Sequence, residues 1–123
     1  MTDPQHLTVD LLVVGSGTGM AAALAAHELG LSTLIVEKTA YVGGSTARSG
    51  GAFWMPANPI LAESGSDDTL QAGHTYIDAV VGDAAPLDRA HAFVDFGAAT
   101  IDMLRRTTPL KFLWAKDYAD YHP

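Results

Sequence analysis

The chain contains no cysteine, so its 123 residues form no disulfide and offer no thiolate nucleophile or cysteine metal ligand. Basic residues are scarce as well: seven Lys and Arg stand against fourteen Asp and Glu, which gives a formal net charge of −7. A nucleic acid or an anionic membrane surface is bound by a basic stripe, which this sequence lacks. The five histidines follow no metal-ligand spacing. We therefore expect no metal site and no nucleic-acid partner.

Long apolar runs are also missing. No segment approaches the roughly 20 apolar residues of a membrane-spanning helix, so we expect no transmembrane segment. The first apolar segment, residues 9–14, contains Asp10, is followed by Gly15 and lacks the basic lead of a signal peptide. This segment is typical of a β-strand, and we expect a cytoplasmic location.

The most informative stretch follows that strand. A glycine-rich turn leads into an alanine-rich helix over residues 20–29, and a second strand over residues 34–36 ends at Glu37. The start of a helix binds a pyrophosphate well when the backbone can come close. A carboxylate about 20 residues after the turn can accept hydrogen bonds from an adenosine ribose. We predict a dinucleotide site, rather than an ordinary glycine turn, that includes the turn residues Gly15, Ser16, Gly17, Thr18 and Gly19.

The turn departs from the usual G-x-G-x-x-G pattern at its third glycine. The third position is Met20, whereas Gly19 arrives one residue early. This glycine normally allows the helix to pack closely on the strand. Either the turn is one residue shorter, or Met20 is accommodated by the small residues after it. We favour the shorter turn.

A second glycine-rich segment follows Glu37 by a few residues and must lie near a bound nucleotide. Paired glycines give backbone donors access to phosphate and flavin, and hydroxyl groups can add hydrogen bonds; the alternative is a flexible loop. The predicted binding residues of this segment are Gly43, Gly44, Ser45, Thr46, Ser49, Gly50 and Gly51.

The rest of the chain predicts mainly helices. Residues 39–66 have no clean period, and an irregular segment of this length is usually functional. Asp67, Asp68 and Thr69 predict the start of a helix that ends near Val81 and is closed by Gly82. A second helix is expected after Asp83, with Pro86 in its first turn, and a short strand over residues 111–114. Two or three strands do not complete a doubly wound α/β sheet, so we expect an incomplete domain.

The motifs together resemble a known group of flavoproteins. Val-Val-Gly-Ser-Gly at 13–17, Val-Glu-Lys at 36–38 and the second glycine segment are similar to the FAD-binding region of the fumarate reductase and succinate dehydrogenase superfamily. Residues 52–56 and 117–123 most resemble the 3-ketosteroid dehydrogenases. The resemblance implies that residues 1–123 are the N-terminal part of a Rossmann-like FAD-binding domain, without the substrate-capping domain, and that Lys38 joins the cofactor site.

The resemblance also implies an activity, the dehydrogenation of ring A of a 3-ketosteroid, with a hydride passing to flavin N5 and a proton to a tyrosine base. Family motifs match Tyr121 to the catalytic tyrosine that assists the base and Tyr118 to the substrate pocket, although the spacing also permits Tyr118 in the catalytic role. Both could instead be half-buried loop aromatics. No histidine lies between His27 and His74, so noncovalent FAD is expected.

Two other functions stay open. A fumarate-reductase-like enzyme acting on another unsaturated or carbonyl substrate needs arginines to hold carboxylates, and the arginines here are not convincingly placed. A dinucleotide-binding module without catalysis is the third possibility. The sequence does not identify the electron acceptor.

Overall fold

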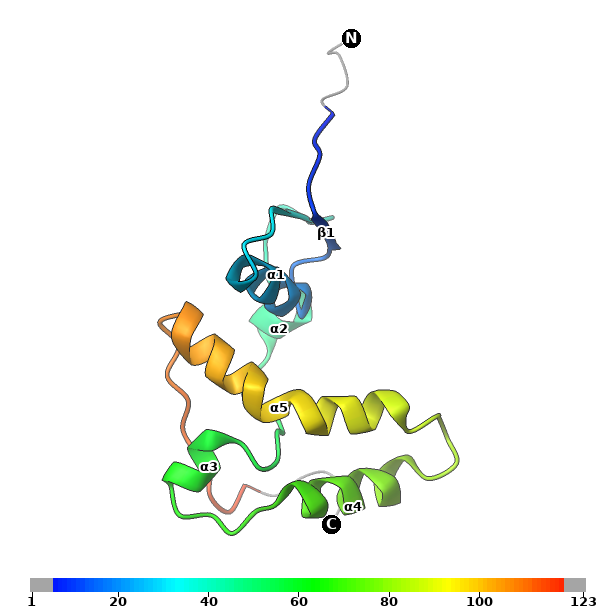
Figure 1. Cartoon of the computed structure of the whole chain (residues 1–123), viewed down its shortest axis with the longest axis vertical. Coiled ribbons are helices and arrows are strands. Elements are labelled where there is room, and N and C mark those ends of the chain that lie inside the picture. Colours follow the sequence, from blue (N-terminus) through cyan, green and yellow to red (C-terminus); the bar gives the residue numbers. More distant parts are fainter. Residues whose placement is uncertain (1–5, 119–123) are drawn as a thin grey trace. The chain divides into compact units, whose positions relative to one another are not determined.

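The computed structural model describes residues 6–118 and divides the chain into two compact units, residues 1–52 and 53–123. Figure 1 labels strand β1 and the five helices of the described residues. Among the described residues no helix combines the length and the apolar composition needed to cross a membrane. The same part of the chain contains no cluster of three or more side chains suited to a metal ion.

The first unit is a βαβ arrangement. Strand β1 (Leu11–Val14) is followed by helix α1 (Gly19–Glu28) and strand β2 (Thr33–Val36), and a short helix α2 (Gly44–Arg48) comes after β2. The two strands are parallel, in a register that runs from Leu11 opposite Thr33 to Val14 opposite Val36. The predicted strand–turn–helix–strand order is confirmed.

The strand pair leaves apolar side chains uncovered. Val14 is 81% exposed, and Leu12, Ile35 and Val36 are exposed too. Parallel sheets in folded proteins are normally covered on both faces, which is why their strands are apolar on both sides. The first unit is therefore an incomplete α/β sheet, as the sequence predicts.

The second unit is helical. It contains α3 (Pro59–Glu63), α4 (Leu70–Val81) and α5 (Asp88–Thr107). Its core lies along α5, where Val94 and Ile101 are each only 1% exposed. Close packing uses glycines: a Cβ at Gly73 would lie 2.7 Å from the Pro56 side chain, and one at Gly97 would lie 2.8 Å from the Met55 side chain.

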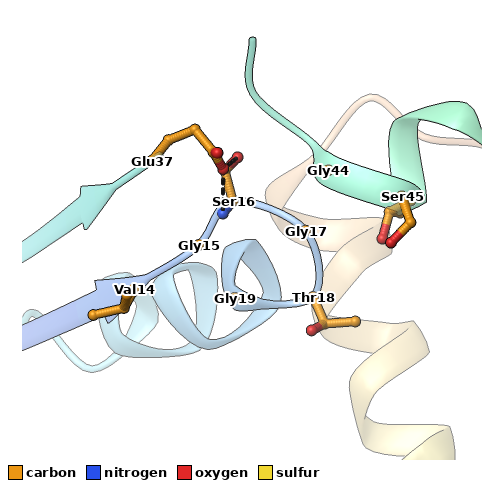
Figure 2. A pocket seen from close by; sticks show the side chains of 10 residues that line it. Val14, Gly15, Ser16, Gly17, Thr18, Gly19, Glu37, Gly44 and Ser45 are labelled. Atoms are coloured by element: carbon orange, nitrogen blue, oxygen red, sulfur yellow. Dashed lines mark hydrogen bonds between the residues drawn. The ribbon is translucent and has the colours of Figure 1, made fainter. Parts of the chain in front are cut away.

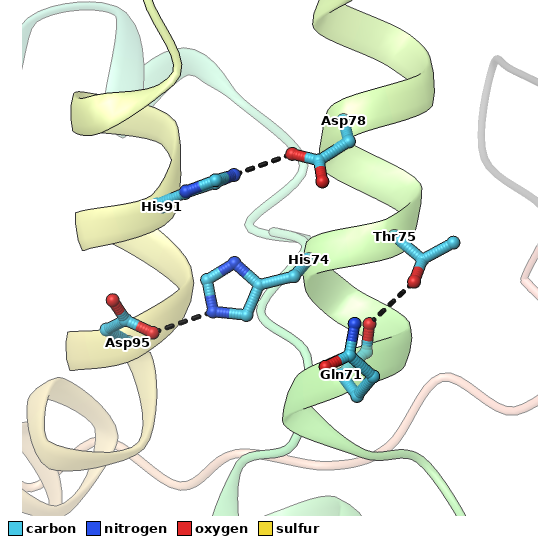
Figure 3. Close-up of polar contacts among 6 residues, drawn as sticks. All are labelled: Gln71, His74, Thr75, Asp78, His91 and Asp95. Carbon is cyan, nitrogen blue, oxygen red and sulfur yellow. Dashed lines mark hydrogen bonds and ion pairs between the residues drawn. The ribbon is translucent and has the colours of Figure 1, made fainter.

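Two polar pairs connect α4 with α5 (Figure 3). His74 Nε2 lies 2.7 Å from Asp95 Oδ1, and His91 Nε2 lies 2.6 Å from Asp78 Oδ1. The two histidine rings meet edge to face, with centroids 4.8 Å apart. These histidines are therefore partnered on the helix surface, as a histidine on a helix usually is.

Several sequence expectations for the second half of the chain are confirmed. The Thr69 hydroxyl accepts the Ala72 N–H and so caps α4, and Gly82 ends that helix. The acids at 67 and 68 precede the cap rather than occupying the first turn. Trp54 contacts the rings of Tyr76 and Phe93 but is still 38% exposed.

Other expectations are wrong. Residues 111–114 form no strand; they have no strand partner, and Phe112 instead meets Phe53 edge to face. Helix α5 begins at Asp88, so Pro86 precedes the helix instead of lying in its first turn. The segment 39–66 is not wholly irregular, because it contains α2 and α3. Helix α3 starts at an Asn58 cap followed by Pro59, which is a recognisable start signal.

Candidate cofactor site

A hollow of about 280 Å³ lies at the carboxyl ends of the two strands (Figure 2). All of its lining residues belong to the first unit. It is lined by the end of β1, the glycine turn, the residue after β2 and the start of α2: Val14, Gly15, Ser16, Gly17, Thr18, Gly19, Glu37, Gly44, Ser45 and Thr46. In parallel α/β sheets this edge is where ligands bind.

The glycine turn has the shorter form that the sequence favours. Gly15 leaves β1 with a φ of 99°, a conformation that glycine adopts readily, and its N–H still bonds to Val36 O at 2.8 Å. Helix α1 begins directly at Gly19, where a Cβ would lie 2.6 Å from Val13 Cγ1. Gly19 is therefore the glycine that lets helix and strand approach closely, and Met20 is partly exposed.

The start of α1 presents free donors. Within residues 6–118, the N–H groups of Gly17, Thr18 and Gly19 donate no hydrogen bond, and the Thr18 side chain makes no capping bond. The first N–H groups of any helix lack intrahelical partners and carry the positive end of its dipole. The turn therefore offers a group of backbone donors to an anion, while no Lys or Arg lines the hollow.

The Glu37 carboxylate lines the same hollow as those donors. Its Oε2 accepts the Ser16 hydroxyl at 2.5 Å and the Ser16 N–H at 3.1 Å, and its Oε1 accepts the Thr39 N–H at 2.9 Å. The Ser16 hydroxyl is the largest cause that lowers the pKa of Glu37 to about 2, followed by the Thr39 and Ser16 amides. Glu37 is therefore a carboxylate at neutral pH, ready to accept hydrogen bonds.

The second glycine segment reaches the same place. Gly43 and Gly44 have φ values of 105° and 54°, and α2 starts at Gly44. The Gly43 N–H donates to Ser16 Oγ at 2.8 Å, and a Cβ added at Gly44 would lie 3.8 Å from Gly17 Cα. The predicted proximity of the two glycine segments is confirmed.

The structure brings together most of the predicted cofactor residues, but not all of them. Lys38, Gly43, Ser49, Gly50 and Gly51 do not line the hollow. Ser49 uses its hydroxyl locally, because it donates to Thr46 O and accepts the Gly51 N–H.

Sequence reasoning missed two residues of the site. Val14 lines the hollow, and Thr39 holds Glu37. Val14 could have been found as the last residue of the strand before the turn. Thr39 gives no sequence signal, because its role depends on the path of the chain after β2.

Tyr118, one of the two predicted tyrosines, does not line this hollow. Tyr118 belongs to the second unit and is 70% exposed. Tyr121 lies outside the described residues. Their roles in substrate binding and catalysis stay predictions.

Known proteins resemble this chain in sequence and in fold. The 3-oxosteroid 1-dehydrogenase of Mycobacterium tuberculosis is 46% identical over 115 residues, which are 93% of this chain and 20% of that relative. The 4-oxocyclohex-2-ene-1-carboxylate 5-dehydrogenase of Sinomonas cyclohexanicum is 38% identical over 123 residues, or 98% of this chain and 20% of that protein. The chain thus spans about a fifth of the length of these curated relatives.

A solved structure agrees with these relatives. The 3-ketosteroid delta1-dehydrogenase of Sterolibacterium denitrificans, in complex with 1,4-androstadiene-3,17-dione, superposes with a TM-score of 0.71 at 36% identity. The superposition covers 80% of this chain and 17% of that one. The resemblance to 3-ketosteroid dehydrogenases that the motifs predict is confirmed.

The family match covers the whole site. The FAD binding domain family matches residues 10–122, which include β1, the glycine turn, Glu37 and α2. Free amides at a helix start, a nearby carboxylate and a closely packed βαβ unit are the features that this cofactor's dinucleotide part requires. The chain belongs to the FAD binding domain family, and FAD is its cofactor.

Proposed function

We propose that the hollow binds the ADP half of FAD in an oxidoreductase that dehydrogenates a ring ketone, with a 3-ketosteroid as the first candidate substrate. The observation that carries this proposal is that free N–H donors at the start of α1 and the ionised Glu37 line one hollow. The 3-oxosteroid dehydrogenases named above support the substrate class.

The roles of the lining residues follow from their donors and acceptors. The amides of Gly17, Thr18 and Gly19 would bind the diphosphate, since they carry the positive end of the α1 dipole. Glu37 would accept a ribose hydroxyl, and its charge would disfavour a 2′-phosphate. Ser45 and Thr46, in the first turn of α2, would add hydroxyl donors.

Bound FAD would supply the electron sink for hydride removal from carbon. The protein's own task is then to remove a proton next to the ketone, which the carbonyl makes acidic. We propose Tyr121 as the tyrosine that assists this proton transfer and Tyr118 as a wall of the substrate site, in keeping with the family motif. Residues 1–123 are, in this proposal, the N-terminal part of the FAD domain, and the substrate-capping domain lies outside them.

The activity is tested in the protein that carries this chain, by following the reduction of an artificial electron acceptor over a panel of 4-ene-3-ketosteroids. Steroid-dependent reduction is expected, and a Tyr121→Phe variant should reduce the rate while still binding FAD. No turnover with any steroid would contradict the substrate class. Precipitation with acid should release the flavin, because no histidine is available for a covalent link in the glycine segments.

A smaller cyclic ketone is the second candidate substrate. The Sinomonas relative is named for a 4-oxocyclohexene carboxylate, which has a ring ketone but no steroid skeleton. Turnover of this acid in preference to every steroid would favour that candidate. A dicarboxylate substrate is less well supported, since Arg105, one of the candidate arginines, is paired with Glu63.

A further inference from the structure

Ser16 occupies a position in the glycine turn where any small residue would fit, yet its hydroxyl both donates and accepts a hydrogen bond. Ser16 is 2% exposed. A hydroxyl has one proton to donate and lone pairs to accept with. The Ser16 proton goes to Glu37 Oε2 at 2.5 Å, and Ser16 Oγ accepts the Gly43 N–H at 2.8 Å. One buried hydroxyl therefore connects three segments: the turn, the end of β2 and the second glycine segment.

These bonds divide the two oxygens of Glu37. Oε2 receives both the hydroxyl and the N–H of Ser16, which use its two lone pairs. This oxygen has no lone pair left to accept a hydrogen bond from a ligand. Any ligand hydroxyl bound by Glu37 must therefore use Oε1.

Oε1 of Glu37 keeps one lone pair that can accept a hydrogen bond. It receives the Thr39 N–H at 2.9 Å. The Thr39 hydroxyl lies 3.2 Å away, but its single proton has a closer acceptor in Tyr41 O at 2.7 Å. The Thr39 hydroxyl thus donates to the chain rather than to Glu37, and one lone pair of Oε1 stays available.

We propose that Ser16 is a positioning residue of the FAD site: its hydroxyl fixes the Glu37 carboxylate and the Gly43 amide together and leaves Glu37 Oε1 to accept a ribose hydroxyl. This inference rests on the proposed FAD site. It goes beyond the glycine pattern, in which alanine or glycine would serve equally well at this position.

The other end of the strand pair provides a matched control. There the Ser32 hydroxyl donates to Asp10 Oδ2 at 2.6 Å, and the Ser32 N–H donates to the same oxygen at 2.8 Å. The chemistry is the same as in the Ser16–Glu37 contact, but neither residue lines the hollow. Ser32→Ala therefore removes equivalent bonds without touching the proposed site.

The test measures FAD binding by flavin fluorescence in the protein that carries this chain, for the wild type, Ser16→Ala and Ser32→Ala. Ser16→Ala should weaken FAD binding about tenfold, which corresponds to one lost hydrogen bond of ordinary net strength, and Ser32→Ala should change it less than about twofold. Equal losses in the two variants, or none in Ser16→Ala, would overturn the inference. Failure of the wild type to bind FAD would instead overturn the proposed site.

A pH profile separates positioning from a general loss of structure. Without the Ser16 hydroxyl the pKa of Glu37 should rise from about 2 toward its ordinary value of 4.5. In Ser16→Ala, FAD binding should then fall as the pH drops through that range, at pH values where wild-type binding is constant.

The Glu37 carboxyl signal in carbon NMR reports this pKa directly and needs no ligand. An unchanged Glu37 titration in Ser16→Ala would contradict the proposal. If that variant does not fold, Ser16→Cys, which is slightly larger and donates only weakly, should show a smaller shift in the same direction. An unshifted titration in Ser16→Cys would contradict the proposal equally.

Discussion

The two ends of the parallel strand pair carry the same contact and differ in what it connects. At the amino ends, Ser32 and Asp10 bond to each other, and the Asp10 N–H returns to the Ser32 hydroxyl. At the carboxyl ends, Ser16 bonds to Glu37 but accepts its third bond from Gly43, in a separate segment. At the amino ends the hydrogen bonds stay between two residues, whereas at the carboxyl ends they join three segments that line or flank the hollow. The difference is therefore in the serine hydroxyl: Ser16 Oγ accepts an N–H from a third segment, whereas Ser32 Oγ accepts one from its own carboxylate partner.

The largest expected difference between the two ends concerns the charge of each carboxylate. Glu37→Gln should weaken FAD binding by about tenfold or more, since it removes a charge-assisted acceptor for the ribose. Asp10→Asn removes a comparable charge at the other end and should leave FAD binding unchanged. Calorimetric titration with FAD measures the affinity of both variants. Equal affinities would contradict the prediction that only the carboxylate at the carboxyl ends of the strands binds FAD.

The next effect concerns how α1 is set on β1 at the carboxyl end. Gly19→Ala would place a Cβ 2.6 Å from Val13 Cγ1, so the helix start must move away from the strand. We expect a loss of about 1–3 kcal/mol in the free energy of unfolding, with weaker FAD binding. Gly50→Ala meets nothing within 4 Å and should change stability by less than about 0.5 kcal/mol. Denaturant unfolding compares the two, and a neutral Gly19→Ala would show that the close approach is unnecessary.

Acid should affect both ends in the same direction. The pKa of Asp10 is lowered mainly by the Ser32 hydroxyl, as that of Glu37 is lowered to about 2 by Ser16. A carboxylate with a lowered folded pKa stabilises the fold above its unfolded value, and the contribution is lost as the pH falls toward the folded value. For Glu37 this window runs from 4.5 down to about 2.

Thermal unfolding across that range checks the assignment. Glu37→Gln should flatten the loss of stability on acidification between these two pH values, because the substituted side chain does not titrate. A pH dependence in Glu37→Gln identical to that of the wild type would show that Glu37 is not the group responsible.

The smallest effect is expected away from the strands, in the pairs between α4 and α5. His91→Gln removes an exposed partner of Asp78 and should cost about 0.2–1 kcal/mol, while FAD binding stays unchanged. His74→Gln should cost somewhat more, because the His74 side chain is 21% exposed against 37% for His91. Denaturant unfolding measures both, and a larger loss for His91→Gln would reverse this order.

Much of the first unit can be predicted from the sequence because its rules are local. The short turn at Gly19 follows from the need for close helix–strand contact, and the ribose carboxylate follows from its distance along the chain. The bonds that set the Glu37 carboxylate are not local. They depend on how Ser16, Thr39 and Gly43 come together in three dimensions, which the spacing of residues along the sequence does not indicate.

The errors have physical causes too. Helix α2 is short and starts with glycine and serine, which favour turns over helices, so its pattern gives no helical signal. Residues 111–114 have the composition of a strand, but a strand forms only beside a partner, and the described residues provide none. Composition alone does not decide either segment.

The central claim is that the hollow binds the ADP half of FAD, and competition between the two halves of the cofactor tests it most directly. FAD bound to the protein that carries this chain is titrated with ADP and, separately, with riboflavin. The account predicts that ADP displaces FAD and that riboflavin does not, because the donors of α1 and the Glu37 carboxylate match a diphosphate and a ribose. Displacement by riboflavin but not by ADP would contradict it.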